Sequence, residues 1–290
     1  NNNPEYIRSV YLRRLALFNT YEINAVEGSA YKIYIYPYNV DKKTEYFNNA
    51  NGTIQNDHSW TYDNLNQVST LISNNSGINT KKEIKYPYNY SEAVYSQMTG
   101  KNIVSPVIEE ITSVKSGVEI ERTKTNYQLI NNFYVPSSTQ ISFTGPNNLI
   151  TVNSFDYYDT RGNILQTTDI GGVRTTYIWG YNYKYLIARI QNASYSQVTA
   201  LINETALSGI AAKSEPTASD MQTIRTLATG LPNALLTTFT YKPLIGIASE
   251  TDPSGRTIYY EYDEFGRLNQ VKDEDGRILK EHRYHYTPQL

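Results

Sequence analysis

The sequence contains no cysteine, and it has only three histidines and two tryptophans among its 290 residues. Without cysteine the chain can form no disulfide framework, no thiol nucleophile and no thiolate metal site. The small number of histidines removes most of the common general-base and metal-binding arrangements. We therefore expect no metal and no cofactor, and the sequence shows no catalytic constellation.

An excess of charge of one sign and long apolar runs are also missing. The formal net charge is -2 and the sequence pI is near 6.0, which excludes a basic field for nucleic acid and an acidic tail. The mean hydropathy is -0.53, and no stretch is typical of a membrane span. The chain starts at Asn1 without an initiating methionine, so we expect a mature or excised segment.

Tyrosine is abundant, with 28 residues against 7 phenylalanines, and the chain is also rich in asparagine and threonine. Tyrosine and threonine favour strands, and asparagine favours tight turns. This composition predicts a β-rich protein with many turns.

Two segments of the chain repeat the same turn pattern. Tyr158-Asp159 is followed by Gly162, and Tyr262-Asp263 is followed by Gly266. A second Asp-x-x-Gly then ends ten positions after each glycine, a further one lies between the two copies, and Tyr62-Asp63 begins a weaker copy with asparagine in the glycine position. The predicted turn residues are Asp159, Gly162, Asp169, Gly172, Asp252, Gly255, Asp263, Gly266, Asp273 and Gly276.

This spacing predicts a run of antiparallel hairpins. In each turn the aspartate side chain can accept backbone amides, and the glycine can adopt a positive φ. Alternation then puts Ile258, Tyr260 and Tyr262 on one face and Tyr259 on the other. Two interpretations stay open here, a sheet covered on both sides or one whose second face is lined by solvated tyrosine hydroxyls.

The segment Tyr262-Asp263-Glu264-Phe265-Gly266-Arg267-Leu268, followed by Asp273 and Gly276, resembles the YD-repeat, or RHS-repeat, family of bacterial secreted and cell-surface proteins. The resemblance is specific over residues 155–182 and 241–286. It implies a long antiparallel sheet that coils as repeats are added, and in large members a hollow shell around a toxic C-terminal polypeptide. The localisation implied is secreted or cell-surface.

The chain also departs from the large members of that family. At about twenty residues per hairpin, 290 residues are too few to close a shell, and we expect no toxin domain after Leu290. Asp252-Pro253-Ser254-Gly255 is similar to the Asp-Pro-x-Gly-Leu end of the family's self-cleaving segment, but Arg256 replaces the leucine. We interpret it as an ordinary hairpin turn.

Two segments carry helical spacing within this strand-rich pattern. Residues 194–206 place Tyr195, Val198, Leu201 and Ile202 at helical intervals. A capping box at Thr217–Asp220 precedes a second helix that ends at Gly230 and Pro232. A shorter helix is expected over residues 91–98. We predict one β-repeat domain over 1–290, with N-terminal strands in 1–59, hairpins in 60–182, a helical insertion in 192–232 and YD hairpins in 233–290.

None of the acidic or histidine clusters has the geometry of a catalytic or metal site. Glu109 and Glu110 are neighbours on a predicted strand and point to opposite faces. Asp273, Glu274 and Asp275 lack the ligand spacing of a calcium loop. His282 and His285 also face opposite ways on a strand.

Tyrosines outside the repeat register are the best binding candidates. Tyr181, Tyr183 and Tyr185 follow Trp179, and strand alternation would put all three on one face. Exposed tyrosines can stack on sugar rings, whereas tyrosines that recur at one repeat position favour a structural role.

We therefore expect a mainly all-β, non-enzymatic scaffold or interaction module, as part of an encapsulating β shell or a truncated relative of one. Its partners would be other RHS segments or a cargo polypeptide. The first alternative is a module that binds surface glycan or protein through exposed tyrosines, and a hydrolase is a distant third.

The ends of such a sheet should present unpaired strand edges. We expect the C-terminal edge at residues 278–286, protected by charges, and the N-terminal edge at residues 31–38. At the N-terminal edge we expect either a covering segment from residues 5–20 or self-association and partner docking.

Overall fold

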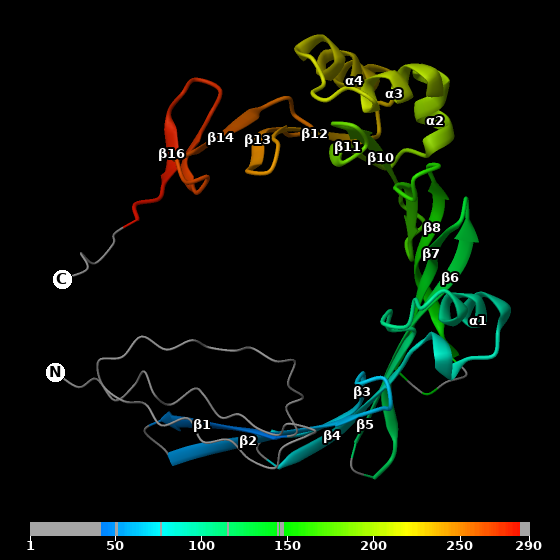
Figure 1. The fold of residues 1–290 in the computed structure, drawn as a ribbon. Coiled ribbons are helices and arrows are strands. Elements are labelled where there is room, and N and C mark those ends of the chain that lie inside the picture. The colour runs from blue at the N-terminus through cyan, green and yellow to red at the C-terminus, as the bar shows by residue number, and fades with distance from the viewer. Residues whose placement is uncertain are drawn as a thin grey trace. The chain divides into compact units, whose positions relative to one another are not determined.

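The computed structural model describes residues 42–49, 52–75, 77–114, 116–143, 145 and 148–284 (Figure 1). Its strands are hydrogen-bonded in the order in which they occur in the chain, and the neighbouring strands with determined registers are antiparallel. The described part of the chain is mostly β, with sixteen strands against four α-helices. This confirms the predicted fold class of an antiparallel hairpin sheet with a small helical insertion.

The strands of the first half are β1 Lys42–Asn49, β2 Gly52–Tyr62, β3 Val68–Asn75, β4 Ile78–Lys85, β5 Glu109–Val114, β6 Glu119–Ile130, β7 Phe133–Ser142 and β8 Ile150–Tyr158. Those of the second half are β9 Ile164–Asp169, β10 Arg174–Gly180, β11 Tyr185–Gln191, β12 Leu235–Lys242, β13 Gly246–Thr251, β14 Thr257–Tyr262, β15 Leu268–Lys272 and β16 Ile278–Glu281. The helices are η2 Pro87–Asn89, a 3₁₀ turn, α1 Ala93–Gly100, α2 Tyr195–Leu201, α3 Glu204–Ala211 and α4 Ala218–Gly230.

The chain divides into two compact units, which we describe one at a time. The first contains the described residues up to 128 and from 138 to 151. There, α1 lies close to the expected position over residues 91–98, and it buries Tyr95 and Met98. Tyr86 and Ile108 are also buried in this unit. A local apolar core therefore accompanies the helix.

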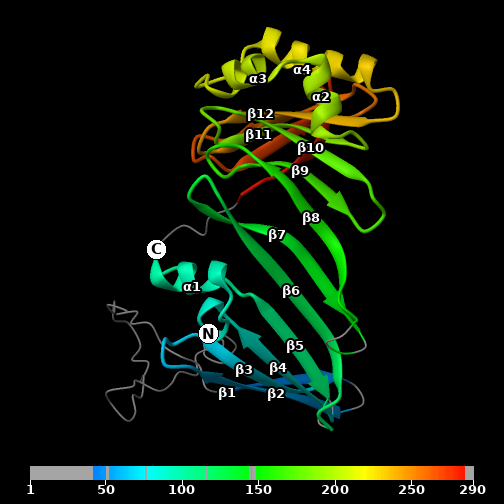
Figure 2. The same cartoon turned by 90° about the vertical axis from the view of Figure 1, so that its right-hand side faces the viewer.

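The second unit contains residues 129–137 and 152–290, and its apolar core lies under helices α2, α3 and α4. These helices cover one face of the sheet over β10, β11 and β12 (Figures 1 and 2). Ile187, Ile190 and Ile224 have no exposed surface, and Ile178 and Leu236 are also buried. Burying such side chains supplies most of the free energy that holds this layer on the sheet.

The helical insertion has three helices where the sequence predicts two. The predicted helix over residues 194–206 ends at Leu201, because Asn203 is extended at φ -68° and ψ 156°. The Asn203 side chain then accepts a hydrogen bond from the Ala206 amide at 2.8 Å and begins α3. The predicted capping box of α4 is confirmed, since Thr217 and Asp220 bond each other's backbone amides.

The C-terminal hairpins from β14 to β16 have a different character. No residue after Thr251 in the described part of the chain is fully buried. Ile258, Tyr260 and Tyr262 are half-buried on one face while Tyr259 is exposed on the other, which confirms the predicted alternation of β14. The last described strand, β16, is shorter than the edge expected at residues 278–286.

Two further expectations concern the ends of the chain. The strand expected at residues 31–38 and its cover from residues 5–20 lie outside the described residues. Within the described residues, no helix is both long and apolar enough to cross a membrane.

Candidate functional site

The three candidate tyrosines do not share one strand face, so that geometric prediction is wrong. Tyr181, Asn182 and Tyr183 have φ values of 52°, 57° and 62° and form a left-handed turn between β10 and β11. Strand alternation does not apply to such a turn. Tyr181 is only 3% exposed and belongs to the apolar core, whereas Tyr185 packs against that core.

The hydroxyls of these tyrosines bind backbone groups of the same unit. The Tyr181 hydroxyl accepts a hydrogen bond from the Tyr241 amide at 2.8 Å, and the Tyr185 hydroxyl accepts one from the Leu244 amide at 3.1 Å. The Tyr183 hydroxyl donates to the Ser208 carbonyl at 3.2 Å. Burial raises the pKa of the Tyr181 hydroxyl, as expected for a group in the core. A glycan-binding role for these tyrosines stays a prediction. The shared, exposed strand face on which that prediction was based is not present in these three residues.

The Asp-x-x-Gly turns share one hydrogen-bond pattern. In the turn of Asp263, the Gly266 amide donates to the Asp263 carbonyl at 3.0 Å, and the Asp263 carboxylate accepts the amides of Phe265 and Arg267 at 2.9 and 3.0 Å. The glycine at the end of each turn has a positive φ, which is 86° at Gly162 and 72° at Gly266. Glycine adopts this backbone at no steric cost.

The same turn is built at the other predicted positions. The carboxylates of Asp159, Asp252 and Asp273 each accept two backbone amides, and that of Asp169 accepts one. In the weaker copy, Asn66 takes the glycine position with φ 59°. The remaining turn glycines Gly172, Gly255 and Gly276 have φ values of 78°, 88° and 78°.

Ion pairs between the aspartate and an arginine add to three of these turns, those of Asp252, Asp263 and Asp273. Hydrogen bonds from the Arg267 guanidinium and backbone lower the pKa of the Asp263 carboxyl. The Ser254 hydroxyl, together with the backbone and side chain of Arg256, lowers the pKa of Asp252. These carboxylates are thus ionised acceptors inside a turn, and that arrangement favours a structural role over proton transfer.

Several hairpins carry one extra residue shortly after the turn. Leu268 and Gln270 of β15 pair with consecutive residues of β14, so Asn269 between them has no pairing partner on β14 and forms a β-bulge. The same offset recurs in other strands that follow a turn. These bulges lie at Ser69, Ile120, Leu165, Ile187, Ala248 and Leu279.

At five of these bulges, those at Ser69, Leu165, Ile187, Ala248 and Asn269, an aromatic side chain in the next strand or just after it donates a hydrogen bond to the carbonyl before the bulge residue. Tyr262, for example, donates to the Ile247 carbonyl at 2.9 Å. The other four bonds are Tyr86 to Val68 at 2.9 Å, Trp179 to Ile164 at 2.8 Å, Tyr241 to Leu186 at 2.8 Å and Tyr284 to Leu268 at 2.8 Å.

In these contacts the aromatic donor always follows, by one residue, the position opposite the acceptor carbonyl. Extending the pairing of β13 with β14 places Glu261 opposite Ile247, and the donor is the next residue, Tyr262. A Cβ on Gly246 would lie 2.8 Å from the Tyr262 Cζ, so glycine lets the ring pass close to the backbone. We call this arrangement the aromatic–bulge contact. Where it occurs, it ties the segment that carries the aromatic donor to the strand before it.

The aromatic–bulge contact gives the Tyr-Asp pair a physical meaning. Tyr262 reaches back to the preceding strand, whereas Asp263 builds the turn that leads to the next strand. Tyr158 and Asp159 divide the work in the same way, since the Tyr158 hydroxyl donates to the Pro136 carbonyl at 2.8 Å. Sequence reasoning missed the carbonyl acceptors because backbone atoms leave no residue-type signal. Their spacing is the signal that could have found them, since Ile164 and Leu268 each follow their turn glycine by two positions.

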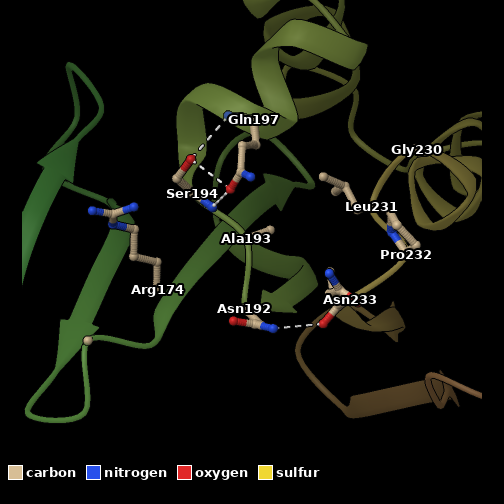
Figure 3. A pocket seen from close by; sticks show the side chains of 11 residues that line it. Arg174, Asn192, Ala193, Ser194, Gln197, Gly230, Leu231, Pro232 and Asn233 are labelled. Atoms are coloured by element: carbon tan, nitrogen blue, oxygen red, sulfur yellow. Dashed lines mark hydrogen bonds between the residues drawn. The ribbon is translucent and has the colours of Figure 1, made fainter.

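A pocket of about 360 Å³ lies between the start of β10 and the ends of helices α2 and α4 (Figure 3). Most of its polar groups hold the loops together. Ser194 and Gln197 cap α2, and the Asn192 side chain donates to the Asn233 carbonyl at 2.9 Å. Arg174 is the charged residue among those that line it, and no histidine, aspartate or glutamate joins it. The pocket therefore lacks a general base for its serine.

A buried charge network in the first unit was also missed by sequence reasoning. Glu109 is 5% exposed, and its carboxylate accepts hydrogen bonds from Arg122 at 2.7 Å and from Tyr90 at 2.9 Å. Burial alone would raise the pKa of the Glu109 carboxyl, but these hydrogen bonds and the charges of Arg122 and Lys85 outweigh it, so the pKa is lowered. Glu110 instead pairs with Lys82, as expected because Glu109 and Glu110 are neighbours on one strand and point to opposite faces. Among the described residues, no three acidic or histidine side chains gather as metal ligands would.

Comparison with known proteins agrees with this repeat geometry. Residues 246–278, which run from β13 into β16, match the family model described as RHS Repeat. The chain carries an RHS repeat. No curated protein sequence matches the chain.

Solved structures similar to this RHS-repeat chain include the crystal structure of TcdB2-TccC3 without its hypervariable C-terminal region, with 11% identity and a TM-score of 0.32. A Tc holotoxin pore of Photorhabdus luminescens is similar with 11% identity and a TM-score of 0.30. The matches cover 79% and 78% of this chain, which spans only 14% and 13% of those chains.

Proposed function

We propose that this chain is a non-enzymatic structural segment of an RHS-type β-sheet, in which its hairpins form part of a wall that holds a cargo polypeptide. The observation that carries the proposal is the aromatic–bulge contact, which recurs at five bulges and there joins the bulged strand to the segment that follows it. A repeat that uses its tyrosines and aspartates in this way lengthens a sheet.

The chemistry of the polar groups supports the same proposal. The repeat carboxylates accept backbone amides in the turns, and the core tyrosine hydroxyls bind backbone groups. Ser194, in the pocket between β10 and helices α2 and α4, caps a helix, and no acid or histidine lines that pocket. A secreted or cell-surface location is part of the proposal, since the RHS repeat at residues 246–278 belongs to a family of such proteins.

The test compares a weakened hairpin with an altered pocket in the full reading frame that contains this chain. Gly266→Val strains a turn, whereas Arg174→Ala changes the pocket and leaves the turns intact. We expect Gly266→Val to expose the cargo polypeptide to added protease, and Arg174→Ala to protect it as the wild type does. Loss of cargo protection in a folded Arg174→Ala variant would contradict the proposal. Turnover of an ester or glycoside by the wild type that is abolished in Arg174→Ala would also contradict it.

A further inference from the structure

A second, smaller pocket in the second unit is lined mainly by residues of β10 and of helix α3. Its volume is about 70 Å³. Ile178, Leu207 and Ala211 contribute buried apolar residues to its lining. The lining also contains four aromatic residues, which are Tyr177, Trp179, Tyr183 and Tyr195. A small apolar pocket with aromatic residues around it is typical of a ligand site.

Two of these tyrosines have rings that are suited to a cation. The Tyr183 hydroxyl donates to the Ser208 carbonyl at 3.2 Å, and the Arg161 guanidinium lies 3.6 Å from the centre of the Tyr183 ring. Burial, together with the negative charge of Glu204, raises the pKa of Tyr195 to about 12, so this hydroxyl is neutral at pH 7. The face of a neutral tyrosine ring attracts cations, as the contact with Arg161 illustrates.

The two carboxylates of the pocket, Asp159 and Glu204, carry negative charge that no ion pair among the described residues balances. In three other repeat turns an arginine four residues later pairs with the aspartate, namely in those of Asp252, Asp263 and Asp273. In the turn of Asp159 that position holds Asn163 instead. Glu204 is exposed in the first turn of α3, and no lysine or arginine lines the pocket. The pocket therefore combines aromatic and apolar walls with an excess of negative charge.

We propose that this pocket binds a quaternary alkylammonium group. The oxygens of its carboxylates already accept hydrogen bonds, from the Arg161 amide and the Asn163 amide and side chain at Asp159, and from the Tyr195 hydroxyl at Glu204. A primary ammonium would lose hydrogen bonds to water and find few acceptors in their place. A quaternary ammonium has no N–H group, yet it is attracted by both carboxylates and by the tyrosine rings.

The size of the pocket agrees with such a group. One water needs about 10 to 15 Å³ of a cavity, so a cavity of about 70 Å³ holds roughly five non-hydrogen atoms. A trimethylammonium head with its first methylene has this size. The inference goes beyond the proposed function and does not rest on it, because a structural segment needs no ligand here.

The test is calorimetric titration of the full chain with choline and with 3,3-dimethyl-1-butanol, which has the same shape and no charge. We expect choline to bind at least about tenfold more tightly. Glu204→Gln should weaken choline binding about fivefold and leave the neutral alcohol unaffected, since it removes one charge from an exposed side chain. The matched control, Glu264→Gln, removes an exposed acid in the turn of Asp263 and should change neither affinity.

Three results would overturn the proposal. Absence of choline binding up to about 10 mM would exclude the site. Equal affinity for choline and the neutral alcohol would show an apolar crevice without preference for a cation. Equal effects of Glu204→Gln and Glu264→Gln would show a general influence of net charge, and chemical-shift changes outside residues 177–183 and 204–211 would put the bound choline on another surface.

Discussion

The second unit stabilises its sheet in two different ways. Under helices α2, α3 and α4, strands β10 to β12 bury a continuous apolar core that includes Ile187, Ile190 and Ile224. From β14 to β16 no described residue is fully buried, and the hairpins depend on Asp-x-x-Gly turns and aromatic–bulge contacts. The comparison teaches that this sheet continues beyond its core by repeating local hydrogen bonds.

The largest difference between the two regions should come from core truncation. Ile224→Ala removes a side chain with no exposed surface, so we expect it to lower the free energy of unfolding by about 2 to 5 kcal/mol. The control, Ile278→Ala, removes an exposed side chain of β16 and should change the free energy of unfolding by less than about 0.5 kcal/mol. Urea unfolding followed by circular dichroism measures both, and equal costs would remove the distinction between the regions.

Turn strain should be the next largest effect, and it acts in the hairpins. Gly266 has φ 72°, so Gly266→Val should cost about 1 to 3 kcal/mol through backbone strain. The nearest atom to an added Cβ is 3.8 Å away, so the Cβ itself meets no steric clash. Gly209→Ala lies in helix α3 with no neighbour within 4 Å and should be neutral or stabilising. An unchanged urea midpoint for Gly266→Val would refute the turn assignment.

Loss of one aromatic–bulge contact should lower the free energy of unfolding by less than strain in a turn does. Tyr262→Phe keeps the ring and removes the hydroxyl that binds the Ile247 carbonyl, so we expect a loss of about 1 kcal/mol. Tyr259→Phe, on the exposed face of the same strand, is the matched control and should cost almost nothing. Thermal unfolding of the two variants distinguishes them. If both melted like the wild type, the contact would contribute no stability.

The smallest effect should be that of a helix cap in the insertion. Hydrogen bonds from Lys213 and Thr217 lower the pKa of Asp220 from 3.8 to about 2. A lowered pKa means that this contribution is complete above pH 3.8 and disappears as the pH falls toward 2. Asp220→Ala should therefore cost about 0.5 to 1 kcal/mol at pH 7, and this cost should shrink as the pH falls through 3.8 toward 2. A cost that is the same at pH 2 as at pH 7 would exclude the ionised carboxylate as its source.

The sequence predicted the hairpins well because turns have a residue code. Aspartate and glycine at fixed spacing specify a turn, and these positions led to β14, β15 and β16. The exposure of Tyr259 followed from alternation alone. The helical insertion was found from its apolar spacing and its Thr217–Asp220 capping box, although Asn203 as a second cap was overlooked.

The rest depended on contacts that residue types do not encode. Tyr181 and Tyr183 adopt positive φ, a conformation rare outside glycine and asparagine, so alternation misplaced them. The acceptors of the aromatic–bulge contacts are backbone carbonyls, which every residue has. The burial of Glu109 depends on Arg122 from the adjacent strand, a pairing that only the register reveals.

Amide hydrogen exchange of the wild type and of Tyr262→Phe, measured residue by residue, tests most directly the claim that local contacts hold the C-terminal hairpins. We predict that β11 exchanges slowest, because it lies in the core, and that its rate is the same in both proteins. In Tyr262→Phe, exchange in β13, β14 and β15 should become about fivefold faster, as expected for one lost hydrogen bond. Unchanged exchange in these strands, or equal acceleration in β11, would contradict the account.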